Sequence, residues 1–215
     1  MIRVLLVDDH ATFREPLAFM LEREPDITVV GQAGTLAEAR GLLQGVDVAI
    51  VDLGLPDGNG MELIRELRAA NPRGLVLVLT VSTARQEKAR AVEAGAAGVL
   101  HKSARIAAVI DAVRRLSAGE PLLSAREVVE LFGEAARHRE QEREVRAALA
   151  QLTGREREVL HALAEGLSDK DIAERLHVAP KTVRTHMANI LGKLGLESRL
   201  QVLVLAVRYG QVTIA

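Results

Sequence analysis

The stretch RVLLVDDHAT, residues 3–12, joins a run of aliphatic side chains to two adjacent carboxylates, Asp8 and Asp9. A short, uninterrupted aliphatic run is typical of a strand that is covered on both faces. Two like charges directly after such a strand repel each other, so a cation, a basic side chain or open solvent must compensate them. The stretch therefore predicts a buried strand whose end needs a partner of positive charge or water.

Four more aliphatic runs follow within the first 120 residues, and segments with helical spacing separate them. Five strand–helix units in succession predict an α/β fold, a parallel sheet with helices on both faces. The flavodoxin-like strand order 2-1-3-4-5 is the expected topology of this (βα)5 domain. The expected strands are 2–7, 27–30, 48–51, 75–79 and 98–100, and the expected helices are 11–24, 35–44, 60–70, 84–94 and 105–117.

Polar side chains end four of these five strands. Asp8 and Asp9 follow the first strand, Asp52 the third, Thr80 the fourth and Lys102 the fifth. In open parallel sheets, ligands bind at the carboxyl ends of the strands, so these side chains are expected to converge. Any one of them alone is more often a turn, packing or solvated residue, but their coincidence favours a site. Carboxylate oxygens suit Mg²⁺, and a lysine can neutralise phosphate charge.

This arrangement resembles the receiver domain of bacterial two-component response regulators, over residues 1 to about 120. The resemblance implies that Asp52 accepts a phosphoryl group from a sensor histidine kinase, while Thr80 and Lys102 contact the phosphoryl oxygens. It implies no other enzymatic activity. The implied Mg²⁺ ligands are Asp8, Asp9, Asp52 and the backbone carbonyl of Gly54.

Two positions depart from the receiver pattern. Val99 stands where the family usually carries a Tyr or Phe that changes rotamer, and Ser103 follows Lys102 in place of the usual Pro. Val99 motivates an alternative, a DNA-binding regulator whose receiver acts independently of phosphorylation. A second alternative, a phosphatase that forms an aspartyl-phosphate, would require an Asp-x-Asp pair after the first strand, where this chain has Asp8-Asp9-His10.

The segment GLSDKDIAERLHVAPKTVRTHMANILGKLG, residues 166–195, carries a second pattern. Helical spacing extends through residues 151–215 and predicts an all-α domain of four helices, at 154–165, 169–176, 180–194 and 198–209. Thr153 with Glu156 makes a capping box, and Ser168 with Asp171 resembles one. The short turn between the second and third helices predicts a helix-turn-helix motif.

The third of these helices has an apolar face and a polar face. An exposed stripe of cations and small residues can enter a DNA major groove, although a solvated face is the simpler alternative. Residues flanking the stripe, and two beyond it, are candidates for phosphate contacts, while capping or core-edge bonding is the alternative for Thr182 and His186. The expected DNA-binding residues are Lys181, Arg184, Thr185 and Ala188 in the stripe and Thr182, His186, Lys193, Lys170 and Arg199 around it.

These segments resemble the LuxR-type domain of NarL/FixJ response regulators, over about 60 residues. The resemblance implies sequence-specific DNA binding as a dimer. Ala179 departs from it, because the family usually has Ser there to cap the recognition helix. The last helix is apolar nearly all round, which predicts either core packing alone or a symmetric dimer contact as well. The expected dimer residues are Leu203, Val204 and Val207.

Three segments therefore make up the expected organisation: a receiver domain at 1–120, a helical linker at 121–150 and a DNA-binding domain at 151–215. Leu131 and Phe132 are expected to pack on the receiver or on a second linker. Without cysteine, signal peptide or membrane span, the chain is expected to be cytoplasmic and to have no membrane partner. The expected partners are a sensor histidine kinase, promoter DNA, a second copy of the chain and RNA polymerase.

Overall fold

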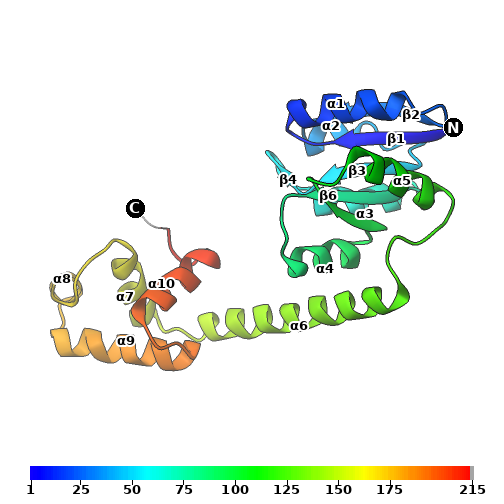
Figure 1. Cartoon of the computed structure of the whole chain (residues 1–215). Coiled ribbons are helices and arrows are strands. Elements are labelled where there is room, and N and C mark those ends of the chain that lie inside the picture. Colours follow the sequence, from blue (N-terminus) through cyan, green and yellow to red (C-terminus); the bar gives the residue numbers. More distant parts are fainter. Residues whose placement is uncertain (214–215) are drawn as a thin grey trace. The chain divides into compact units, whose positions relative to one another are not determined.

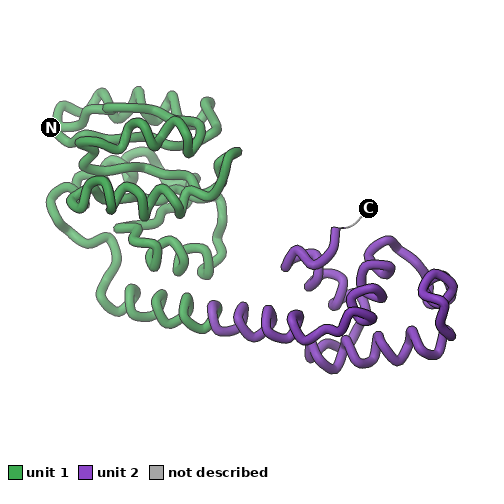
Figure 2. Tube along the Cα trace, turned by 180° about the vertical axis from the view of Figure 1, so that it is seen from behind, with its two compact units in different colours: residues 1–138 green, residues 139–215 purple. Residues whose placement is uncertain are grey.

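The computed structural model describes residues 1–213, in two compact units. The first unit is Met1–His138 and the second begins at Arg139 (Figure 2). The boundary falls inside helix α6 (Ala125–Ala150), so the expected linker at 121–150 is divided between the units. No helix among the described residues combines the length and the apolar character of a membrane span.

The first unit is built on a five-stranded parallel sheet with the strand order β2-β1-β3-β6-β7 (Figure 1). This order confirms the flavodoxin-like topology predicted from the sequence. Its strands are β1 (Ile2–Val7), β2 (Ile27–Ala33), β3 (Val48–Asp52), β6 (Leu75–Thr80) and β7 (Gly98–His101). Its helices up to residue 117 are α1 (Ala11–Glu22), α2 (Leu36–Arg40), α3 (Gly60–Ala70), α4 (Arg85–Ala94) and α5 (Ile106–Ser117).

The strands place alternate side chains on opposite faces, so the sheet carries a separate core on each side. Leu5 and Val51 lie in the core that α2, α3 and α4 cover. Leu6 and Ile50 lie in the core beneath α1 and α5. Because both faces are covered, the strands read as continuous aliphatic runs, and only their ends are available to polar groups.

Three elements differ from the expectation. Helix α2 ends at Arg40, not near residue 44, and Gly41, a residue that disfavours helix, follows it directly as the C-cap. Strand β2 extends to Ala33, three residues beyond the expected end. A hairpin of two short strands, β4 (Gly54–Leu55) and β5 (Gly58–Asn59), follows Asp52 and is absent from the expected strands.

The second unit consists of helices, as predicted. They are the end of α6, α7 (Gly154–Ala164), α8 (Asp169–Arg175), α9 (Pro180–Leu194) and α10 (Arg199–Arg208). Capping boxes start α7 at Thr153 and α8 at Ser168, which confirms both expectations, and a third starts α10 at Ser198. Ala179 gives α9 no side-chain cap, but Pro180 occupies its first turn, where the missing N–H costs nothing.

The first half of α6 packs on α4 within the first unit. Leu131 and Ala135 are buried against Ala89 and Val92 of α4. This confirms the receiver as the docking partner of Leu131, one of the two alternatives. Phe132 is 46% exposed and lies outside this cluster.

Candidate functional site

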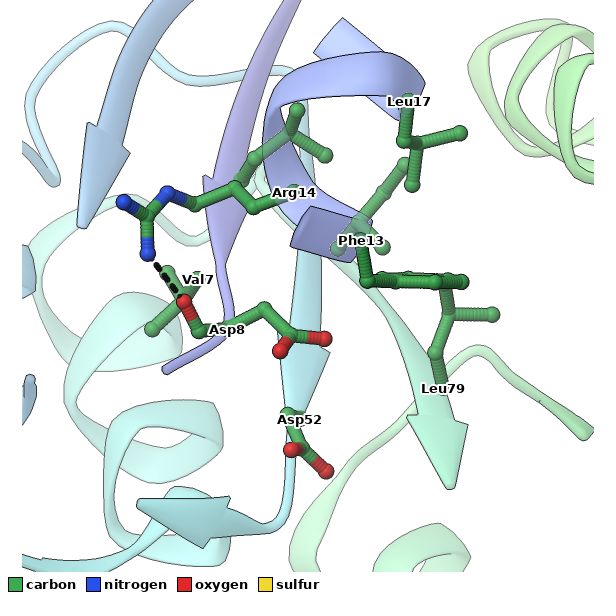
Figure 3. A pocket seen from close by; sticks show the side chains of 9 residues that line it. Val7, Asp8, Phe13, Arg14, Leu17, Asp52 and Leu79 are labelled. Carbon is green, nitrogen blue, oxygen red and sulfur yellow. Dashed lines mark hydrogen bonds between the residues drawn. The ribbon is translucent and has the colours of Figure 1, made fainter. Parts of the chain in front are cut away.

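Two buried carboxylates lie at the ends of neighbouring strands. Asp8 directly follows β1 and Asp52 ends β3, and the register pairs Val7 with Val51 (Figure 3). Asp8 is 5% exposed and Asp52 is 8% exposed. Buried carboxylates require a positive partner or hydrogen bonds, so the strand ends must supply one.

Lys102 is that partner. It follows β7, and its Nζ lies 2.7 Å from Oδ2 of Asp8 and 2.7 Å from Oδ2 of Asp52. Burial lowers the pKa of Lys102, but the hydrogen bonds that its ammonium donates to Asp52 and Asp8 outweigh burial and raise its pKa above the ordinary value. The ammonium also lies 5.2 Å from the ring centre of Phe13, within the range of a cation–π contact. A basic side chain thus compensates Asp8 and Asp52.

Asp9 is more open to solvent and pairs with His10, whose Nδ1 lies 2.6 Å from Oδ1 of Asp9. Ligand atoms of Asp8, Asp9, His10 and Asp52 all lie within 4.8 Å of one another. Three of these four residues offer carboxylate oxygens, the ligands that Mg²⁺ prefers. The donor set therefore fits a hard divalent cation, as the sequence indicated.

The backbone after Asp52 shapes the space around its carboxylate. The N–H of Gly54 donates to Oδ1 of Asp52 at 3.3 Å. Gly60 opens α3 so close to this segment that an added Cβ would lie 2.1 Å from the carbonyl oxygen of Asp52. Glycine is therefore required at position 60 for the β4–β5 hairpin to fold back beside the phosphoacceptor candidate.

Thr80 lies at the end of β6 and is 6% exposed. Its hydroxyl donates to Oε1 of Glu87 at 2.6 Å and accepts from the N–H of Ser82 at 3.0 Å. Thr80 thus lies at the predicted edge of the sheet, but its hydroxyl already donates its one hydrogen bond to Glu87 of α4. Val99, on the neighbouring strand β7, packs against the cluster that Leu131 and α4 form.

Sequence reasoning missed three residues of this site: His10, Arg14 and Glu87. Arg14 donates through Nη1 to the backbone oxygen of Asp8 (Figure 3). His10 and Arg14 directly follow the acidic pair, and their positions at the start of a helix could have indicated them. Glu87 lies seven positions after Thr80, across a loop, and no sequence pattern indicates that contact.

The second unit carries the predicted helix-turn-helix. Helices α8 and α9 are joined by a short turn in which His177 has a left-handed backbone, with φ 53°. Val183, Met187 and Ile190 of α9 are buried in the core of the unit. The opposite face of α9 is open to solvent, as the sequence predicted. The residues exposed there are Lys181, Arg184, Thr185, Ala188 and Asn189.

The exposed stripe is suited to contact with another molecule. Within residues 1–213, neither Lys181 nor Arg184 makes an ion pair. The Thr185 hydroxyl donates to the carbonyl of Lys181 at 3.1 Å, so its donor is satisfied within the helix. Thr182 and His186 are half-buried at the edge of this face, and Lys170 is exposed on α8.

Two expected phosphate contacts, Lys193 and Arg199, form ion pairs within their own unit. The ammonium of Lys193 is held at 2.7 Å by Glu156, which is 3% exposed, and at 3.1 Å by the carbonyl of Gln151. Arg199 is paired with Asp169 at the start of α8. Both cations therefore join helices of their own unit, and their contact with phosphates stays a prediction.

The residues of the last helix, α10, differ in burial. Leu203 and Val207 are partly buried against the core of their own unit. Leu200 and Val204 are 67% and 60% exposed, one turn apart on α10. Of the three expected dimer residues, only Val204 belongs to the exposed apolar face, and Leu200 joins it.

Comparison with known proteins gives two family matches. Residues 4–114 match the response regulator receiver domain, and residues 150–206 match the luxR family of bacterial regulatory proteins. The DNA-binding transcriptional activator DevR/DosR of Mycobacterium tuberculosis is 38% identical over 208 residues, which cover 96% of this chain and 94% of the relative. The transcriptional regulatory protein LiaR of Bacillus subtilis is 36% identical over 210 residues, 97% of this chain and 98% of the relative.

Among solved structures, a LuxR-family two-component response regulator from Aurantimonas sp. SI85-9A1 is similar with a TM-score of 0.53. It is 32% identical, and the match covers 64% of this chain and 96% of that one.

Proposed function

This chain belongs to the two-component response regulators that join a receiver domain to a LuxR-type domain, and from that premise we propose that phosphorylation of Asp52 controls its DNA binding. The proposal makes the first unit the input and the second unit the output. A sensor histidine kinase is the proposed phosphoryl donor, and promoter DNA is the proposed ligand of α9.

One observation carries the proposal: Asp8, Asp52 and Lys102 meet at the ends of three strands that are far apart in the sequence. A carboxylate can act as a nucleophile, and a neighbouring ammonium can stabilise charge that develops on oxygen. The 2.7 Å contact between Lys102 and Asp52 supports this role for Lys102.

The proposed step is a direct transfer to Asp52. An Oδ atom of Asp52 attacks the phosphorus of a phosphohistidine, the new P–O bond forms as the P–N bond breaks, and the histidine leaves. Bound Mg²⁺ would supply charge that offsets the phosphoryl oxygens. Lys102 pairs with the same group through its ammonium, and Asp8 and Asp9 are the proposed ligands that hold the cation beside Asp52, together with the Gly54 carbonyl.

In the second unit, α9 is the proposed recognition helix. Its exposed stripe combines a long guanidinium with small side chains, which allows the helix to approach base edges closely. Arg184 is the proposed base reader because it is exposed and without an ion pair among the described residues. Lys170 and Lys181 are the proposed phosphate contacts, and Thr182 and His186 lie at the edge of the same surface.

A homodimer is the proposed DNA-bound form. Leu200 and Val204 present two large apolar side chains to solvent on one face of α10. Apolar side chains this exposed are stabilised when a symmetric partner covers them.

Coupling between the units is tested by DNA binding with and without beryllofluoride, which mimics an aspartyl-phosphate. The DNA is a duplex selected from random sequence by the full-length protein, and anisotropy measures its affinity. We expect beryllofluoride with Mg²⁺ to raise the affinity of the wild type and to leave Asp52→Asn unchanged. The alternative, suggested by Val99, is a receiver that acts independently of phosphorylation, and it requires equal affinity under all four conditions.

A further inference from the structure

Thr80 has one hydroxyl proton, and in this structure Glu87 holds it. The O–H donates to Oε1 of Glu87 at 2.6 Å, and the same oxygen accepts from Ser82, so the donor direction is fixed toward α4. A hydroxyl donates one hydrogen bond only. It therefore cannot donate to a phosphoryl group on Asp52 while it donates to Glu87.

Helix α4 cannot move together with Thr80 toward Asp52, because contacts with the first half of α6 hold α4 in place. Arg85, in the first turn of α4, makes ion pairs with Glu130 at 3.0 Å and Glu134 at 2.7 Å. Ala89, on the same helix, is buried against Leu131. These contacts anchor α4, so the Thr80–Glu87 hydrogen bond has to break when Thr80 turns to another acceptor.

We propose that Glu87 is a positioning residue that acts through Thr80 and opposes capture of the phosphoryl group. This inference rests on the proposed function of Asp52 and adds a residue that regulates the same site. The carboxylate of Glu87 competes with the phosphoryl oxygens for the Thr80 proton. Removing the competitor is expected to favour the phosphorylated form of the receiver.

The size of the effect follows from the bond. A hydrogen bond to a charged acceptor contributes enough to change an equilibrium by about tenfold or more. Beryllofluoride is therefore expected to bind full-length Glu87→Ala about tenfold more tightly than wild type in the presence of Mg²⁺. Glu87→Gln keeps an acceptor but loses its charge, so its affinity should lie between those of the other two.

The test is a double-mutant cycle measured by calorimetric titration of beryllofluoride into the full-length protein. In the Thr80→Val background, Glu87→Ala is expected to change the affinity little, because the proton for which Glu87 competes is gone. Gln86→Ala is the matched control: Gln86 lines the same cavity of about 200 Å³ beside α4 and should leave the affinity unchanged.

A merely structural role for Glu87 would weaken beryllofluoride binding when the side chain is removed, so an unchanged or lower affinity of Glu87→Ala overturns the inference. If that variant does not fold, Glu87→Gln must show the smaller rise, and its failure to do so overturns the inference as well. If Glu87→Ala raises the beryllofluoride affinity equally in the Thr80→Val background, the inference is overturned too. A wild type that binds no beryllofluoride contradicts the proposed function itself, and the inference with it.

Discussion

The ammonium of Lys193, near the end of α9, lies 2.7 Å from Oε2 of Glu156, a carboxylate buried at the start of α7. The same oxygen accepts from the backbone N–H of Thr153 at 2.7 Å and so completes the capping box of α7. Glu156 therefore contacts two elements at once, and Lys193 fixes the last turn of α9 to the first turn of α7.

Lys193→Met should destabilise the second unit without altering its electrostatic contact with DNA. The variant leaves the Glu156 carboxylate buried without its ammonium, which costs about 1–3 kcal/mol of unfolding free energy. Urea unfolding can be followed by the fluorescence of Tyr209, the only tyrosine of the chain, which packs against the core of this unit.

Lys181→Met is the control for this variant, because Lys181 is exposed on the same helix. It should leave the unfolding free energy nearly unchanged and lower the slope of log affinity against log salt by about one unit per monomer. If Lys193→Met instead lowers the salt slope of DNA affinity and leaves the unfolding free energy unchanged, Lys193 contacts a phosphate.

The stability of the second unit should also depend on pH through Glu156. Burial raises the pKa of this carboxyl, but the hydrogen bonds from Lys193 and Thr153 outweigh burial and lower the pKa below its ordinary value of 4.5. A carboxyl whose pKa is lowered on folding stabilises the folded state at pH values above its ordinary pKa. This contribution disappears as the pH falls through the pKa of the folded state.

The check on this linkage is the unfolding free energy of wild type and Glu156→Gln between pH 7 and pH 3. The difference between the two proteins should be constant near neutral pH and shrink as the pH falls below about 4.5. A difference independent of pH would show that the charge of Glu156 contributes nothing to folding.

Much of the fold and the centre of the site could be predicted from the sequence. Aliphatic runs mark buried parallel strands, and the polar residue after each run must lie at one edge of the sheet. This is why Asp8, Asp52 and Lys102 were expected together, and the 2.7 Å contacts confirm it. The roles of these residues in phosphoryl transfer stay predictions.

Side-chain partners across loops could not be predicted. Glu87 accepts the hydrogen bond from Thr80 because the loop before α4 brings that helix beside β6. Lys193 pairs with Glu156, a carboxylate 37 positions away. In both pairs the partners lie on different elements, so no helical or strand period indicates the contact. Helix α2 ends earlier than its spacing predicts, since Gly41 directly follows Arg40 and glycine disfavours the helix.

Arg184 is expected to read bases. Arg184→Ala should cost about 1–3 kcal/mol of binding free energy on the selected duplex and relax the preference at one base pair of each half-site. Arg184→Lys is the matched variant, because it keeps the charge but loses the planar two-donor contact. It should lose the same base preference while keeping the salt slope of wild type.

The measurement is affinity on the selected duplex and on single base-pair variants of it, at several salt concentrations. If Arg184→Ala weakens all sequences alike and leaves the preference unchanged, the stripe on α9 is not the reading face. Another side of the helix would then have to enter the groove.

Val204→Glu should weaken self-association without destabilising the monomer. The side chain is 60% exposed, so a charge there is solvated in the monomer but becomes buried in the proposed dimer. Sedimentation in the presence of beryllofluoride should show association at least about tenfold weaker than in wild type. Val129→Glu, at a position of α6 that is 71% exposed, is the control and should leave association unchanged. Equal association of the two variants would remove α10 from the interface.

Phosphoryl uptake tests most directly whether Asp52 is the phosphoacceptor. The measurement is the intact mass of the full-length protein after incubation with acetyl phosphate and Mg²⁺, for wild type, Asp52→Asn and Asp9→Ala. We expect one base-labile phosphoryl group on wild type, none on Asp52→Asn, and slower uptake by Asp9→Ala because it lacks a proposed Mg²⁺ ligand. Uptake by Asp52→Asn equal to that of wild type would contradict the assignment of Asp52 as the phosphoacceptor.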